Sequence, residues 1–451
     1  MFVNQNIIIR FVISNKIDAF FLCITLKLKL FLLQAKNSDI MYYHNYIRRN
    51  KFMKKALSII LAFVLAFGML LPASAASETD AKLQFNDDGK FRIMQIADIQ
   101  DGPLLLDITR DYIEEMVVYT KPDLVVLTGD NISAGASSIG THALDLVLVK
   151  AAIGRYMSIF EEYNVPVAVV FGNHDAEEIV SKEEQMEIYM SYDCCVAIDD
   201  GDALYGCGTY NVPIYSKDDA NKVAYNLWMI DSNMYDDERG GYDYVHQDQL
   251  DWYVEKSNEL KAQNGGEVVP SMMFQHIIVN EIYDVISEVP ANEKDNYEYV
   301  EEYNEETGES KYYAINPENL RTGEINEMPC PGTFDGEQFE TVVAQGDVVA
   351  MFFGHDHKNT FEVEYQGVDL VNTPGIGYNS YGDHNRGVRV IDIEEGTRDY
   401  ETEVIKYLDY YADDKAALER FVFYGSEHEV IDQIVSFFKY IWFSITAIFG
   451  F

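Results

Sequence analysis

Apolar runs in this sequence end at or close to side chains that can bind a metal ion. The runs have the length and composition of buried strands. The side chains offer carboxylate oxygens, an amide oxygen and imidazole nitrogens, and they are Asp98, Asp130, Asn173, His276, His355 and His357. Such donors suit divalent first-row metals. The pattern therefore predicts a metal site that is built from residues far apart in the sequence.

Taken singly, each of these residues has an ordinary structural explanation. Asp98 could cap a helix, residues 129–131 and 172–175 could form turns, and His276 could be a hydrogen-bonded core histidine. Ligands of open α/β sheets, however, collect outside the carboxyl ends of the strands. Six metal-capable residues at such ends are improbable by chance, so the metal site is the preferred interpretation.

The elements that must position these residues alternate between strand and helix patterns. The apolar runs are 91–98, 123–130, 165–175, 223–232, 268–277 and 347–357, and the helical patterns are 107–120, 141–163, 182–191 and 247–261. Residues 360–375 and 386–394 have the pattern of closing antiparallel strands. This alternation predicts an α/β domain around a largely buried sheet.

The motifs around the six residues resemble the signature of the calcineurin-like metallophosphoesterase superfamily. They are D-I-Q at 98–100, G-D-N at 129–131, G-N-H-D at 172–175, His276 after an apolar run, and G-H-D-H at 354–357. The resemblance spans about residues 90–393 and is greatest to the purple-acid-phosphatase-like branch that includes fungal Dcr2-type phosphoesterases. It implies a four-layer αββα sandwich of two mixed β-sheets flanked by helices.

The resemblance also implies roles for individual residues in the hydrolysis of a phosphate monoester or diester. One metal would be held by Asp98, Asp130 and His357, and the second by Asp130, Asn173, His276 and His355. A hydroxide that bridges the two ions would attack the phosphorus in line. His174 matches the family's general acid or transition-state stabiliser, and Asp175 is expected to orient its imidazole.

The sequence departs from the family pattern at two positions. Gln100 stands where most members have a histidine ligand, and Ser133 stands where a purple acid phosphatase has a tyrosine. An amide oxygen from Gln100 favours Mn or Fe over Zn at the first metal, or a weaker first site. One alternative is therefore a non-catalytic surface or binding protein that keeps the fold. Another, which rests on the apolar end of the tail, is an envelope-associated structural protein that uses this tail for assembly.

The ends of the chain predict export to the cell exterior or envelope. Residues 53–75 have the basic start, apolar stretch and Ala-Ser-Ala site of a signal peptide, and a retained membrane anchor is the alternative. Residues 1–52 are then an upstream extension from a misassigned start, or else a real membrane segment. The predicted order continues with a linker (76–89), the metallophosphoesterase domain (90–400, with an acidic insertion or loop at 291–345) and a helical tail (401–451).

Charge restricts the partners that the protein can take. The formal net charge is −41. So acidic a protein is not expected to carry a nucleic-acid groove, whereas a small phosphate ester could still be drawn in by bound cations. Four cysteines follow the signal peptide and could form one or two disulfides: Cys194, Cys195, Cys207 and Cys330. The apolar segment 430–451 predicts either contact with a membrane surface or packing on protein.

Overall fold

A computed structural model describes residues 82–102, 106–133, 142–177, 179–198, 203–304 and 307–425. All of them fall within one unit of the chain, Ser74–Glu427. The upstream extension 1–52, the signal peptide 53–75 and the apolar segment 430–451 lie outside the described residues. No helix in the described part of the chain is both long enough and apolar enough to span a membrane.

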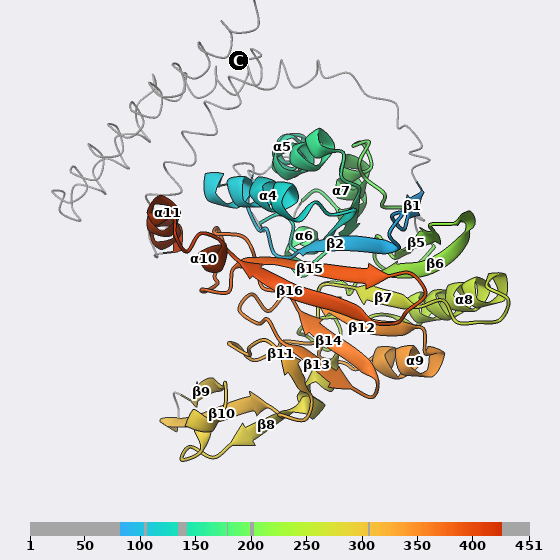
Figure 1. Cartoon of the computed structure of the whole chain (residues 1–451). Coiled ribbons are helices and arrows are strands. Elements are labelled where there is room, and N and C mark those ends of the chain that lie inside the picture. Colours follow the sequence, from blue (N-terminus) through green and yellow to red (C-terminus); the bar gives the residue numbers. More distant parts are fainter. Residues whose placement is uncertain are drawn as a thin grey trace, which may run out of the picture. The chain divides into compact units, whose positions relative to one another are not determined.

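A five-stranded sheet has the order β16-β15-β2-β3-β4. Its strands are β2 (Lys90–Ile96), β3 (Leu124–Thr128), β4 (Val167–Val170), β15 (Gly387–Glu394) and β16 (Tyr400–Lys406). The first three run parallel, whereas β15 is antiparallel to both β2 and β16. Three helices lie along this sheet in Figure 1: α4 (Asp107–Thr120), α5 (His142–Tyr163) and α7 (Lys182–Tyr189).

An eight-stranded sheet forms the second half of the sandwich, with the order β1-β5-β6-β7-β12-β14-β13-β11. Its strands are β1 (Leu83–Gln84), β5 (Tyr210–Ser216), β6 (Asp219–Met229), β7 (Ser271–Phe274), β11 (Leu320–Thr322), β12 (Val348–Phe353), β13 (Glu362–Tyr365) and β14 (Val368–Asn372). Its central strands β6, β7, β12 and β14 run parallel. Helices α8 (Gln247–Gln263) and α9 (Gln338–Gln345) lie beside it (Figure 1).

Side chains that alternate along β12 show how the layers stack. Ala350 and Phe352 belong to the apolar core that also contains the five-stranded sheet and its helices. Met351 and Phe353 belong to the second core, together with Tyr253 of α8 and residues of α9. Because successive side chains of a strand point to opposite faces, the large sheet lies between the small sheet and α8 and α9. This order confirms the predicted four-layer sandwich of two mixed sheets.

A buried arginine joins the two sheets. Arg389 of β15 is 1% exposed and donates from Nη2 to the carbonyl oxygens of Thr360 (2.9 Å) and Asn372 (2.8 Å). Its Nε donates to Thr373 Oγ1 at 3.0 Å, and that hydroxyl donates to Gln95 Oε1 of β2 at 2.7 Å. This network satisfies polar groups that would otherwise be buried without partners where the sheets meet.

The remaining elements correct three predicted boundaries. Part of the expected linker is strand β1. Residues 400–406, most of which were assigned to the helical tail, form strand β16. The helices of this region are α10 (Tyr407–Tyr410) and α11 (Lys415–Gly425). The expected insertion 291–345 is neither one unit nor a loop. Its first part contains η2 (Lys294–Asn296), β9 (Val300–Asn304) and β10 (Glu309–Ile315), which form a small sheet with β8 (Ile286–Val289), and its last part is α9. Phe339 and Val342 of α9 are buried, so this helix belongs to the domain core.

Candidate metal centre

The six metal-capable residues lie in loops at the carboxyl ends of strands from both sheets. Asp98, Asp130 and Asn173 follow β2, β3 and β4 of the five-stranded sheet, and Asn173 begins the short helix α6 (Asn173–Ala176). His276 follows β7, and His355 and His357 follow β12, in the eight-stranded sheet. All six side chains are buried. The site therefore lies where the two sheets meet, as the strand-end argument predicts.

One group of ligand atoms comes from Asp130, His276 and His355, which lie within 4.8 Å of one another. His276 Nε2 is 3.3 Å from Asp130 Oδ2, and it is also 3.3 Å from His355 Nδ1. Two nitrogens and a carboxylate oxygen at these spacings surround a space of the size that a metal ion with bonds near 2 Å requires.

A second group comes from Asp98, Asp130 and His357, also within 4.8 Å of one another. His357 Nε2 is 3.3 Å from Asp98 Oδ1. Asp130 belongs to both groups, so its carboxylate could bridge two ions. The structure thus brings together the residues of each predicted ligand set that carry a carboxylate or an imidazole.

Backbone carbonyl groups orient two of the imidazoles. His276 Nδ1 lies 2.8 Å from Thr128 O, and His357 Nδ1 lies 2.8 Å from Tyr381 O. A protonated Nδ1 donates to each carbonyl, which leaves Nε2 of both rings facing the carboxylates. Fixing the tautomer in this way is typical of histidines that bind metals.

Unpartnered buried atoms test whether the site fits metal ions. Asp98 Oδ1 and both amide atoms of Asn173 are buried and have no hydrogen-bond partner. Leaving such atoms unpaired is costly in a folded protein, and coordination of a cation would satisfy the two oxygens. The donor set of oxygens and imidazole nitrogens fits a pair of first-row metal ions.

The backbone around the site is held in conformations that non-glycine residues rarely adopt. Four residues of the site have positive φ angles: Asp98 (53°), Gln100 (40°), Asp130 (49°) and His355 (68°). Such left-handed residues are costly and cluster at functional sites. Gly129 (φ 88°) is also required here, because a Cβ on it would lie 2.6 Å from His276 Nδ1.

The carboxylate of Asp130 and the imidazole of His276 form an ion pair within the site. Burial tends to raise the pKa of Asp130, but the adjacent His276 outweighs it and sets that pKa well below its usual range. Burial tends to lower the pKa of His276, but the contact with Asp130 raises it to about 10. Burial and the charge of His276 lower the pKa of His355 to about 3. A cation that binds here must therefore displace a proton from His276.

Gln100 lies beside the shared carboxylate. Its side chain is buried, and Nε2 donates to Asp130 Oδ2 at 2.8 Å. The amide that replaces the family's histidine is therefore at the site and next to the carboxylate that could bridge the metals. In this arrangement the amide contacts Asp130 through its nitrogen.

The structure places His174 at the edge of the site and assigns it a different partner from the one predicted. Its Nε2 is 3.9 Å from Asp130 Oδ2, while its Nδ1 lies 2.8 Å from Glu177 Oε2. Asp175 was expected to orient this ring, but its carboxylate instead accepts from the backbone N–H groups of Gly172 (2.9 Å), Asn131 and Ile132 (both 3.0 Å). The expected orienting role of Asp175 is therefore corrected: it joins two ligand-bearing loops.

Glu177 and the two tyrosines that lie beside the site, Tyr235 and Tyr242, were not predicted from the sequence. Glu177 stands three residues after His174, which is the spacing that brings side chains together on a helical turn, and this signal was available. Tyr242 packs edge-on against His355, with ring centroids 4.5 Å apart, and stacks on Tyr235. Tyr235 Oη in turn donates to Glu177 Oε1 at 2.7 Å. No motif in the sequence indicates this chain of contacts.

The fold and the site together define a class of protein: a two-sheet α/β sandwich with a candidate dimetal centre between its sheets. The family model of the calcineurin-like phosphoesterases matches residues 91–359, which is more than half of the chain. The chain belongs to the calcineurin-like phosphoesterase family.

Relatives with curated names point to the branch that the motifs indicate. The chain is 26% identical over 349 residues to the "Probable inactive purple acid phosphatase 14" of Arabidopsis thaliana, covering 69% of this chain and 77% of that protein. It is 29% identical over 238 residues to "Phosphatase DCR2" of Saccharomyces cerevisiae, covering 47% of this chain and 39% of that protein. Among solved structures, a dimetal phosphatase from Danio rerio covers 70% of this chain and 99% of its own, at 14% identity and a TM-score of 0.41.

Proposed function

We propose that this protein is a metal-dependent phosphoesterase that hydrolyses a small phosphate monoester or diester. The observation that carries the proposal is the convergence of buried carboxylate, amide and imidazole groups from the ends of five strands. Two of these groups, on Asp98 and Asn173, have a buried oxygen without a hydrogen-bond partner. Two divalent or trivalent metal ions, with Mn or Fe favoured and Zn possible, fit this donor set.

The residues of the chain have separable tasks in this reaction. Bound metal ions would polarise the phosphoryl oxygens and activate a water molecule for in-line attack. Asp130 would hold both ions, and His276 and His357 present Nε2 because their Nδ1 atoms are engaged. His174, at the edge of the site, is positioned to donate a proton to the leaving oxygen or to stabilise the charge that develops on it.

A non-catalytic binding protein is the second candidate. The name of the Arabidopsis relative includes the word "inactive", and Gln100 replaces a family ligand in this chain. A protein of this kind would bind metal ions or phosphate without turnover. The two candidates differ in one measurable property, which is hydrolysis by the metal-loaded protein.

Substitution of candidate metal ligands tests the proposal. Asp130→Asn and His355→Ala should each lower kcat/KM by about 100-fold or more, which exceeds the loss typical of residues that only support a ligand. The assay is hydrolysis of an aryl phosphate and a bis-aryl phosphate with and without added manganese, alongside metal content.

Asp413→Asn serves as the matched control, because Asp413 is exposed and should leave both readouts unchanged. Hydrolysis by the metal-free Asp130→Asn protein at the wild-type rate would refute the mechanism. Metal binding without hydrolysis of either substrate class would favour the binding protein.

A further inference from the structure

Three carboxylates converge at a place that the metal centre does not use. Glu281, Asp335 and Glu340 each offer an oxygen within 4.8 Å of the others. Glu281 belongs to the 3-10 helix η1 (Asn280–Val285), Asp335 lies in the loop before α9, and Glu340 lies in the first turn of α9. Three separate segments thus bring negative charge to one point.

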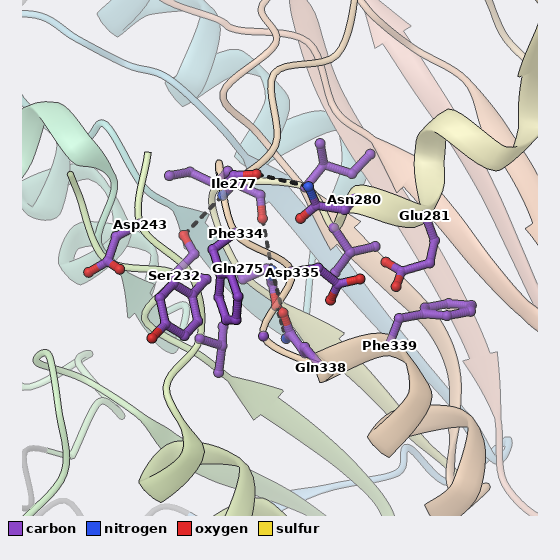
Figure 2. A pocket seen from close by; sticks show the side chains of 16 residues that line it. Ser232, Asp243, Gln275, Ile277, Asn280, Glu281, Phe334, Asp335, Gln338 and Phe339 are labelled. Carbon is purple, nitrogen blue, oxygen red and sulfur yellow. Dashed lines mark hydrogen bonds between the residues drawn. The ribbon is translucent and has the colours of Figure 1, made fainter. Parts of the chain in front are cut away.

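Glu281 is the unusual member of this cluster. Glu281 is only 8% exposed, and its Oε1 atom is buried without a hydrogen-bond partner. Figure 2 shows the carboxylates of Glu281 and Asp335 turned toward each other among the residues that line a small pocket. A buried carboxylate oxygen that faces other carboxylates requires a compensating positive charge or a proton.

Basic side chains do not supply this charge. Among the ion pairs of the described residues, none joins a lysine, arginine or histidine to Glu281, Asp335 or Glu340. Burial, together with the neighbouring Asp335, Glu340 and Asp284, raises the pKa of Glu281 to about 7. The remaining candidates for the counter-charge are a proton on Glu281 and a bound cation.

We propose that Glu281, Asp335 and Glu340 bind a hard divalent cation of the calcium type, at a site separate from the candidate metal centre. The donor set consists of carboxylate oxygens alone, without the nitrogen or sulfur atoms that favour zinc or copper. Calcium accepts irregular arrangements of six to eight oxygens, including water, whereas magnesium demands a near-ideal octahedron. Asp335 and Glu340 are exposed, so water can complete the coordination.

The position of the site gives the cation a structural consequence. Helix η1 begins four residues after His276, and α9 packs in the same apolar core as Met351 and Phe353 of β12. None of the candidate metal ligands lines the pocket. A calcium ion would therefore connect the segment after β7 to α9 and stabilise it without taking part in the metal centre.

Calcium titration of the manganese-loaded full chain tests this proposal. Isothermal titration calorimetry should find one calcium ion per chain, and calcium at 100 times its Kd should raise Tm by about 4 °C. Asp335→Asn and Glu340→Gln alter exposed residues, so they should fold, and each should lower calcium affinity at least about 10-fold. Glu255→Gln, an exposed charge removal on α8, should change neither value.

Binding should also depend on pH. Because Glu281 must lose its proton to coordinate calcium, the affinity should fall about 10-fold between pH 8 and pH 6. A wild-type protein that binds no calcium and whose Tm does not respond to it would overturn the proposal and leave Glu281 neutralised by a proton. Calcium binding that is lost in Asp98→Asn but retained in Asp335→Asn would overturn it as well, because the ion would then occupy the metal centre.

Discussion

Gln100 places a neutral amide beside Asp130, the carboxylate that the two candidate metal groups share. A neutral amide contributes a weaker donor than an imidazole to a borderline metal such as zinc. This one side chain can therefore set which metal the group of Asp98, Asp130 and His357 prefers, while the group of Asp130, His276 and His355 keeps two imidazoles.

Replacing Gln100 tests this effect. Gln100→His should raise zinc occupancy and shift the competition between zinc and manganese toward zinc. Metal content and competitive loading of wild type and variant provide the measurement. Gln263→His, on the exposed surface of α8, controls for the mere addition of an imidazole. Unchanged occupancy and competition would mean that Gln100 does not face the first metal.

We expect Glu177 to act through His174 and not on the substrate itself. Its carboxylate lies 2.8 Å from His174 Nδ1 and also accepts from Tyr235 Oη. Glu177→Gln keeps the shape but weakens the hold on the imidazole. We expect kcat to fall about 10-fold with little change in KM, as for other residues that orient a functional histidine.

Leaving-group dependence separates this role from a merely structural one. A proton donor matters most when the leaving oxygen is strongly basic, so the loss in Glu177→Gln should be larger for an alkyl phosphate than for a nitrophenyl phosphate. Glu177→Asp should restore part of the rate. An equal loss for both substrates would contradict the role assigned to Glu177 and His174.

Much of the site could be predicted from the sequence because its ligands follow recognisable strands. Each metal-capable residue stands at a strand end, and strand ends of one sheet lie side by side. The role of Asp175 could not be predicted, because two carboxylates, Asp175 and Glu177, follow His174 within three residues. Which of the two carboxylates contacts the imidazole depends on the directions of the side chains around α6. In the structure, the carboxylate of Asp175 instead accepts hydrogen bonds from three backbone N–H groups.

At the scale of elements, the two sheets are joined by polar as well as apolar contacts. Arg389 of β15 satisfies the carbonyl groups of Thr360 and Asn372 beside the larger sheet. Arg389→Leu should lower the free energy of unfolding by about 3 kcal/mol, because these buried acceptors lose a charged donor. Denaturant titration of metal-free protein measures the loss.

The control for this prediction is Arg398→Leu. Arg398 is exposed, so its removal should change stability by no more than about 0.5 kcal/mol. A similar small change in Arg389→Leu would show that water replaces the guanidinium at no cost.

Elements with strong apolar periodicity were predicted correctly. Strands that depend on hydrogen-bonded pairing with a neighbouring strand were missed. Helix α4 has the predicted bounds, 107–120, because its buried residues recur at helical spacing. Strand β5 was missed because Pro213 interrupts its pattern, and only pairing with β6 and the short β1 makes it part of the sheet. Strand β16 was missed because many of its side chains are polar, and it depends on its antiparallel partner β15.

At the scale of the whole molecule, we propose that the protein is exported and begins near Ala76 in its mature form. The Ala73-Ser74-Ala75 site follows a basic start and an apolar stretch in signal-peptide order. N-terminal sequencing of exported protein should find Ala76 or a neighbour. Ala75→Trp should block cleavage, because this position requires a small residue. Exported protein that retains residues 1–52 would contradict both cleavage and the proposed start at Met53.

The metal centre takes three candidate ligands from each sheet, and this division has a consequence for folding. A partly folded chain in which only the first sheet has formed holds Asp98, Asp130 and Asn173 without any imidazole from the second sheet. Cations should therefore bind late, after the distant segments have met. Bound ions would then leave the folding rate almost unchanged and slow unfolding instead, so that metal loading determines the lifetime of the native state.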